Sequence, residues 1–175
     1  MKTETADRNF IVVCHNLRSA GNIGSIFRTA EGAGASQIIL GGYCAPGSHP
    51  KVAKTALGAQ KILRSRQVFA TWRALQKLKT AGYQILALEK SANARNLFTF
   101  RPRPPLALVV GNEKRGLSAA LRKYCDATLA IPMRGQKESL KVAVAFGIAI
   151  YHLIDKTKIH GKNSKIERAK KNRRN

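Results

Sequence analysis

The run Leu106–Val110 (LALVV) constrains the fold of this 175-residue chain more than any other segment. It is apolar at every position, follows Pro102, Pro104 and Pro105, and ends at Gly111. A strand with one face in water would alternate apolar and polar residues, so this run predicts a strand that is buried on both faces. Sheets built from such strands are mostly parallel and carry helices on both sides. We therefore expect an α/β fold.

Further apolar runs alternate with helical patterns along the chain. Four more strands are predicted, over Phe10–Cys14, Gln37–Leu40, Tyr83–Leu88 and Ala127–Ile131. Helices are predicted where apolar residues recur at helical spacing, over residues 23–30, 71–81 and 139–154. This order favours a mostly parallel sheet flanked by helices, in one domain over residues 1–155.

The net charge of +23 indicates a polyanionic partner, because such a surface attracts polyanions and speeds their encounter with the protein. Residues 156–175 carry nine Lys or Arg and one acid, Glu167, a net charge of +8, so residues 1–155 retain +15 (23 − 8). The excess is not confined to a tail, which favours nucleic acid over an anionic membrane or general solubility. Residues 156–175 are poor in apolar side chains, and we expect them to form a flexible basic C-terminal arm.

Other classes of protein find little support. The longest apolar stretch, Val142–Tyr151, is far shorter than the roughly 20 residues that span a bilayer, and the N-terminus has no signal-like apolar region. Cys14, Cys44 and Cys125 are odd in number and form no CxxC pattern, which favours a reduced, cytoplasmic setting. The histidines lack metal-ligand spacing, so we expect no metal. Walker, GxSxG and dinucleotide-binding motifs are absent, since Gly32-Ala-Gly34 ends a helix.

Three short segments place polar side chains among glycines: Asn22–Arg28 (NIGSIFR), Val110–Leu117 (VGNEKRGL) and Ile131–Leu140 (IPMRGQKESL). The second and third each leave a predicted strand, and the carboxyl ends of parallel strands are where α/β proteins bind ligands. Taken alone, Glu113 is equally well interpreted as a charge at the start of a short helical turn over Leu117–Lys123. Ser139, taken alone, reads better as the N-cap of the last helix. Two such loops at neighbouring strand ends nevertheless favour a binding site.

Together the three segments resemble the SpoU/TrmH branch of the SPOUT methyltransferases, over nearly all of residues 10–154. That family methylates ribose 2′-hydroxyls of RNA and uses S-adenosylmethionine. The resemblance implies a SPOUT-type α/β fold with a C-terminal deep trefoil knot between the last two segments, and a homodimer. Val52–Ala59 also resembles the family's small-residue segment, and either RNA contact or packing is open for it.

The resemblance also implies catalytic roles. The Asn and Arg of the family's first motif correspond to Asn22 and Arg28, where the residues alone would suggest a surface or capping arginine. An intrinsic pKa above about 12 argues against arginine as a base. We therefore expect Arg28 to orient the ribose hydroxyl and to stabilise the developing alkoxide. Glu113 and Ser139 correspond to the acid and the serine of the two later motifs.

The other expected site residues form two groups. Cofactor binding is expected from Val110, Gly111, Asn112, Glu113, Gly116, Leu117, Ile131, Met133, Gly135, Ser139 and Leu140. RNA binding is expected from Arg18, Lys51, Lys54, Lys114, Arg115, Arg134, Lys162, Arg168, Lys170 and Lys171. S-adenosylmethionine is a sulfonium cation, so backbone carbonyls, apolar side chains and Glu113 suit it, provided that Lys114, Arg115 and Arg134 point away toward RNA.

Lys141 departs from the family pattern. The family usually has Ser-Leu-Asn-Val-Ser-Val-Ala here, and this chain has Ser139-Leu-Lys-Val-Ala-Val-Ala145. Lysine cannot accept a hydrogen bond, so Lys141 either contacts the target phosphate or marks a weakened or inactive enzyme. We predict an RNA 2′-O-ribose methyltransferase acting on tRNA or rRNA. The alternative is a catalytically inactive RNA-binding or ribosome-assembly protein on the same fold. The glycine-bearing loops disfavour a third reading, a basic ribosomal-type protein without a cofactor pocket.

Overall fold

Strand β6 (Leu106–Val110) lies inside a seven-stranded sheet in the computed structural model, which describes the backbone of residues 10–172 and the side chains of residues 10–157. The strand order is β3-β2-β1-β6-β4-β7-β5, and every adjacent pair is parallel. The other strands are β1 (Phe10–His15), β2 (Gln37–Gly41), β3 (Arg64–Val68), β4 (Gln84–Leu88), β5 (Arg95–Asn96) and β7 (Ala127–Ala130). The predicted parallel sheet with β6 buried inside it is confirmed.

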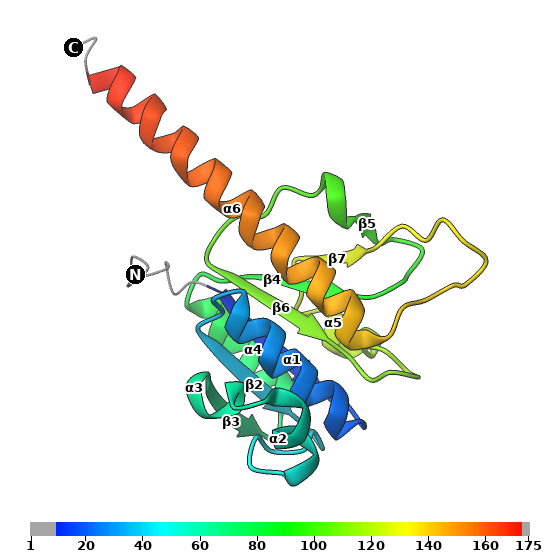
Figure 1. Ribbon diagram of the computed structural model, residues 1–175. Coiled ribbons are helices and arrows are strands. Elements are labelled where there is room, and N and C mark those ends of the chain that lie inside the picture. Colours follow the sequence, from blue (N-terminus) through cyan, green and yellow to red (C-terminus); the bar gives the residue numbers. More distant parts are fainter. Residues whose placement is uncertain (1–9, 173–175) are drawn as a thin grey trace.

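Helices cover both faces of the sheet (Figure 1). One face packs against α1 (Ala20–Gly32), α2 (Pro50–Ala56), α3 (Ala59–Ile62), the 3₁₀ helix η1 (Leu97–Thr99) and α6 (Val142–Asn172). The other face packs against α4 (Thr71–Thr80) and α5 (Ala119–Arg122). Along β1, Val12 and Cys14 join the first layer, and Ile11 and Val13 join the second. This period of two explains why the inner strands are apolar at nearly every position.

Helix α1 forms where the apolar spacing predicts it. Ile23, Ile26 and Phe27 are fully buried against the sheet. Ser19 is the N-cap, and its hydroxyl accepts a hydrogen bond from the backbone N–H of Asn22 at 3.2 Å. The first segment of the three motifs is therefore the capped start of a helix that one sheet face holds in place.

The segment 52–59, for which packing and RNA contact were both open, packs against α1. Val52 and Ala56 are buried, and the Thr55 hydroxyl donates a hydrogen bond to the carbonyl of Gly21 at 3.0 Å. Lys51 and Lys54 lie on the exposed side of α2. The small residues thus serve the packing, and the lysines face solvent.

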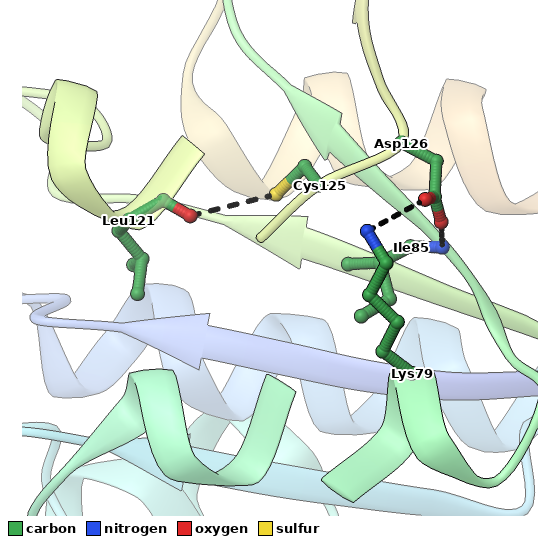
Figure 2. A network of polar contacts seen from close by, with 5 residues as sticks. All are labelled: Lys79, Ile85, Leu121, Cys125 and Asp126. Carbon is green, nitrogen blue, oxygen red and sulfur yellow. Dashed lines mark hydrogen bonds and ion pairs between the residues drawn. The ribbon is translucent and has the colours of Figure 1, made fainter. Parts of the chain in front are cut away.

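A second set of contacts ties the amino ends of β4 and β7 to α4 (Figure 2). The Asp126 carboxylate accepts a hydrogen bond from the backbone N–H of Ile85 at 2.8 Å and pairs with Lys79 Nζ at 3.1 Å. The backbone N–H of Asp126 donates to the Ile85 carbonyl at 2.7 Å. Burial, followed by the nearby Asp126 charge, raises the pKa of the adjacent Cys125 thiol to about 12, so this thiol is protonated at neutral pH. These contacts fix the register of two strands whose other ends carry the candidate site.

The last helix differs from its prediction at both ends. It begins at Val142 rather than at Ser139, and its backbone continues to Asn172. Residues 156–172 therefore extend α6, and the flexibility expected of the basic arm stays a prediction, as does the trefoil knot. Within the described residues, no helix combines the length and the apolar character needed to cross a bilayer.

Candidate functional site

The carboxyl ends of β6, β4 and β7 border a cavity of about 680 Å³. Val110, Leu88 and Leu129 are paired in register, so these three strands end at the same level. The second and third segments leave the sheet there and form opposite walls, and Asn22 of the first segment joins them. The lining consists of Asn22, Leu88, Glu89, Lys90, Gly111, Asn112, Glu113, Lys114, Arg115, Gly116, Leu129, Ala130, Ile131, Met133, Glu138, Ser139, Leu140, Lys141, Val142 and Ala145.

Asn112 organises the loop that follows β6. Its side chain is buried, and its amide nitrogen donates to the Asn16 carbonyl and to the Tyr43 hydroxyl, each at 2.8 Å. Its amide oxygen accepts hydrogen bonds from the backbone N–H groups of Lys114 at 3.0 Å and Arg115 at 2.9 Å. A buried amide with every one of these contacts satisfied makes the loop conformation well defined.

The two glycines of this loop allow the backbone to approach its neighbours closely. A Cβ added at Gly111 would lie 2.7 Å from the backbone carbonyl carbon of Gly116. Gly116 has a positive φ of 62°, and a Cβ there would collide with the Glu89 carboxylate. Glycine is therefore required at both positions for the loop to close as it does.

Glu113 ties this loop to the start of α1. Its carboxylate accepts hydrogen bonds from the backbone N–H groups of Arg18 at 3.0 Å and Ser19 at 3.1 Å, and from Asn22 Nδ2 at 3.1 Å. Partial burial raises the pKa of the Glu113 carboxyl, but these donors together lower it by more, so its pKa lies below the usual value. Glu113 does place a negative charge at the start of a helix, as its alternative interpretation expected, but the helix is α1 and not α5.

Glu89, directly after β4, is a lining residue that the sequence prediction missed. Its carboxylate accepts a hydrogen bond from the backbone N–H of Leu117 at 2.9 Å. The signal for it was an acid at the end of an apolar strand in a chain with only 9 Asp and Glu. Glu89, Glu113 and Glu138 all line the cavity. Four cations, Lys90, Lys114, Arg115 and Lys141, line the cavity as well, so its lining presents charges of both signs.

The opposite wall, residues 131–141, is far more exposed. Glu138 pairs with Lys90 Nζ at 3.3 Å between two exposed side chains. The carbonyl of Lys141 accepts hydrogen bonds from the backbone N–H groups of Val144 and Ala145, both at 2.9 Å, which places Lys141 at the N-cap of α6. The interpretation of Ser139 as that N-cap is therefore wrong. The lysine side chain, unlike that of serine or asparagine, offers no acceptor to the first N–H groups of the helix.

Some predicted residues stand apart from the cavity. Val110 and Leu117 are buried in the core rather than among the lining residues, and Gly135 is exposed outside it. Arg28 lies on the exposed side of α1, also outside the lining. The other predicted cofactor residues, with Asn22 and Lys141, do line the cavity.

The predicted RNA-binding residues divide in a similar way. Lys114 and Arg115 line the cavity, whereas Arg134 does not. Two of the three cations that were expected to point away from a sulfonium cofactor therefore lie at its cavity. Arg18, Lys51 and Lys54 are exposed and are not among the lining residues. The side chains of four further residues lie outside the described residues: Lys162, Arg168, Lys170 and Lys171.

The cysteines and histidines are not arranged for catalysis in the part of the chain that the structure describes. Burial, followed by the neighbouring thiol of Cys44, raises the pKa of Cys14 well above its ordinary value, and burial also raises that of Cys44. Among residues 10–157, no cluster of three or more His, Cys, Asp or Glu side chains forms a metal site. The chemistry available is therefore that of a cavity with carboxylates, cationic side chains, backbone groups and apolar side chains.

Comparison with known proteins supplies the family. Residues 9–151 match the family described as SpoU rRNA Methylase. The 23S rRNA (guanosine-2'-O-)-methyltransferase RlmB of Burkholderia sp is 36% identical over 133 residues, which cover 76% of this chain and 53% of the relative. The chain spans about half to three fifths of the length of the first curated relatives that it matches.

Solved structures agree with the sequence match. The A. aeolicus TrmH/SpoU tRNA modifying enzyme has a TM-score of 0.80 at 29% identity, over 92% of this chain and 81% of that chain. An AdoMet bound rRNA methyltransferase from Sinorhizobium meliloti has a TM-score of 0.78 at 29% identity, over 83% of this chain and 55% of that chain. The likeness extends over most of the described fold.

Proposed function

The chain belongs to the SpoU rRNA methylase family, and from this premise we propose that it methylates ribose 2′-hydroxyls of tRNA or rRNA with S-adenosylmethionine. One observation carries the proposal: residues of all three motif segments, the first of them far from the other two in sequence, line a single cavity at the carboxyl edge of the sheet. The name of the RlmB relative and the AdoMet bound neighbour support the reaction and the methyl donor.

The lining suits S-adenosylmethionine. When bound, this cofactor supplies an activated methyl group on a positively charged sulfur. Glu89 and Glu113 provide negative charge, while Ile131, Met133 and Leu140 provide apolar contact for the uncharged parts. Gly111 and Gly116, which approach each other closely, present backbone rather than side chains to the cavity at their two positions. The positive charges of Lys114, Arg115 and Lys141 then remain for the phosphates of RNA.

Arg28 is the proposed partner of the ribose hydroxyl. Its guanidinium orients the hydroxyl and stabilises negative charge on the attacking oxygen. Asn22 and Glu113 position the first turn of α1 through their hydrogen bond at 3.1 Å, so they set where the helix carrying Arg28 lies. Ser139 and Lys141 complete the cavity from the other wall, with Lys141 as the contact for the target phosphate.

A second copy of the chain brings Arg28 to the cavity. Arg28 lies outside the lining of its own cavity. Val144, Ile148 and Tyr151 form an exposed apolar stripe on α6 at spacings of four and three residues. The Tyr151 hydroxyl lies 3.4 Å from the position of a Cβ on Gly32, one turn beyond Arg28. A homodimer that buries this stripe therefore also covers the Arg28 face of α1, which supports a site shared between two subunits.

The test is methyl transfer from labelled S-adenosylmethionine to tRNA and rRNA, followed by alkaline hydrolysis. Methylation of a 2′-hydroxyl blocks cleavage of the following phosphodiester, so the label should appear in alkali-resistant dinucleotides. Arg28→Ala should lose transfer and keep cofactor binding. Label on bases alone would overturn the proposal, and cofactor and RNA binding without transfer to any RNA would favour the inactive RNA-binding alternative.

Mixing two inactive variants tests the shared site. Arg28→Ala and Leu140→Arg are each expected to be inactive, because one lacks the guanidinium and the other adds a cation to the cofactor cavity. A mixed dimer keeps one intact site, so activity should reappear after the two variants are unfolded and refolded together. No recovery, with mixed dimers demonstrated by mass spectrometry, would place Arg28 at the cavity of its own chain.

A further inference from the structure

Exposed aromatic side chains lie at the carboxyl edge of the sheet, beyond the cavity. Tyr43 follows β2 and is 60% exposed, Phe69 follows β3 and is 96% exposed, and Trp72 in the first turn of α4 is 42% exposed. We call these three residues the aromatic edge. Single exposed rings are ordinary, but three along one edge of a sheet indicate a surface that a partner covers.

The aromatic edge is joined to the cavity by hydrogen bonds. Asn112, which lines the cavity, donates to the Tyr43 hydroxyl at 2.8 Å, and the backbone N–H of Tyr43 donates to Asn16 Oδ1 at 3.2 Å. The His15 ring at the end of β1 is bonded to the hydroxyl of Thr71, the residue before Trp72, at 2.8 Å. One continuous set of contacts along the strand ends therefore leads from the cavity to Trp72.

The far end of this path is cationic. The Arg73 guanidinium lies 5.1 Å from the centre of the Trp72 ring, within the range of a cation–π contact. Beside them is a groove of about 510 Å³, lined by Trp72, Arg73, Gln76, Lys77, Thr80 and Ala81. These lining residues include two cations and no acid, which suits a ligand that combines flat rings with negative charge.

We propose that the aromatic edge binds unpaired nucleotides of the RNA strand whose ribose enters the cavity. Base faces are open to stacking only in unpaired segments, and proteins that bind them combine aromatic side chains with a positive groove. Tyr43 stacks with the base nearest the cavity, and Phe69 and Trp72 receive bases farther along, with phosphates near Arg73 and Lys77. The inference deepens the proposed function and rests on it for the ribose at the cavity. It selects a single-stranded loop or bulge, rather than a continuous duplex, as the substrate.

Trp72 is the only tryptophan in the chain, so its fluorescence reports on this surface alone. The full chain is titrated with a short single-stranded oligoadenylate, with an RNA duplex of the same length and with polyglutamate, and RNA binding is measured in parallel by filter retention. Stacking on the ring should quench Trp72 fluorescence at the same oligoadenylate concentrations that give retention. Unchanged fluorescence at saturation, or equal quenching by the duplex or by polyglutamate, would overturn the proposal.

Substitutions supply the second readout. Trp72→Ala and Phe69→Ala should each weaken oligoadenylate retention at least about fivefold, the factor that corresponds to the weaker base–aromatic stacking energies. Trp72→Phe should keep most of the affinity. Phe98→Ala is the matched control, since Phe98 is 45% exposed and contacts His152 of α6 on the opposite face of the sheet. Because Phe69 is almost fully exposed, its replacement does not endanger folding.

The same samples separate this inference from the proposed function. Titration with S-adenosylmethionine tests the cavity independently of RNA. Cofactor binding with Trp72→Ala and Phe69→Ala both behaving like Phe98→Ala would overturn the aromatic edge and leave the proposed function standing. If oligoadenylate quenches Trp72 fluorescence and the two alanine variants bind it more weakly, but the protein does not bind S-adenosylmethionine, the aromatic edge would stand as an RNA-binding surface. The proposed methyltransferase function would then be overturned.

Discussion

In the wall of the cavity formed by residues 111–117, the side chains of Asn112 and Glu113 and the backbone N–H of Leu117 are hydrogen-bonded within the protein. In the wall formed by residues 131–141, most side chains face solvent. We call the first the braced wall and the second the open wall. Both leave the sheet at the same level, and both carry residues of the motif segments. Their sequences alone, each with glycine and charged residues, do not reveal this difference.

The comparison indicates a division of labour within one cavity. A wall whose donors and acceptors are already hydrogen-bonded costs no further conformational entropy when a ligand binds. An exposed wall with few internal contacts can change conformation around the ligand, at a cost in entropy. We therefore expect the braced wall to determine whether the protein folds with a cavity. The open wall should determine chiefly how tightly the cavity closes on a ligand.

The largest contrast is expected between two glycines. Gly111→Ala should lower the free energy of unfolding by about 3 kcal/mol, because its Cβ would press on the Gly116 backbone. Gly135→Ala should change it by less than about 0.5 kcal/mol, because the space around Gly135 is open. Urea unfolding of both variants measures the difference. Equal losses would show that the two walls are equally packed and would break the comparison.

Asn112→Ala should lower the free energy of unfolding by about 2 kcal/mol, because the half-buried Asn16 carbonyl and the Lys114 and Arg115 N–H groups lose their partner. Ser139→Ala on the open wall is the matched control, and its stability should match that of the parent within about 0.5 kcal/mol. The two values come from the same denaturant series. A greater loss for Ser139→Ala would reverse the assignment of the walls.

Glu113→Gln should lower stability at neutral pH by about 1 kcal/mol, a charged hydrogen-bond value reduced for partial exposure to solvent. The folded-state pKa of Glu113 is depressed below 4.5, so its contribution is present above that pH and is lost as the pH falls through the folded pKa. The stabilities of variant and parent should therefore converge in acid. Glu138→Gln, which removes an exposed ion pair on the open wall, serves as the control. A Glu113 effect that is independent of pH would contradict the role of its charge.

Lys141→Asn has the smallest expected effect and the opposite sign. Asparagine at the N-cap of α6 supplies an acceptor for the first N–H groups of the helix, which should raise the melting temperature by the equivalent of about 0.5–1 kcal/mol. It also removes a positive charge from the cavity lining, so S-adenosylmethionine should bind more tightly. Lys137→Asn on the same exposed loop should do neither. A less stable Lys141→Asn protein would place the cap elsewhere.

The fold was predictable where the pattern of apolar residues indicates which side chains are buried. Leu106–Val110 is a strand with the predicted bounds, and Ile23, Ile26 and Phe27 form the buried face of α1. Strand β3 was not predicted, because it is an edge strand of sequence RSRQV whose side chains are mostly exposed, and it is held by backbone pairing with β2. Pairing of that kind leaves no hydrophobic pattern to recognise.

It was predictable from the sequence that these loops come together at the site, but not which residues contact one another there. Glu113 is predicted as a site residue, yet its partners lie 91 to 95 residues away in sequence, and nothing local points to them. Glu89 lies outside the glycine-bearing segments and was missed. Ser139 was assigned the N-cap position that Lys141 occupies, because serine is a preferred N-cap residue and lysine is not. The N-cap preference of a residue predicts the first residue of a helix poorly where a binding loop precedes that helix.

Calorimetric titration of the full chain with S-adenosylmethionine tests the central claim most directly, that the two walls enclose a site for this cofactor. We predict saturable binding with one site per chain, abolished by Leu140→Arg and unchanged by Ile62→Arg, which makes the same replacement at an exposed residue outside the cavity. Absence of binding to the folded protein, or equal binding by both variants, would contradict it.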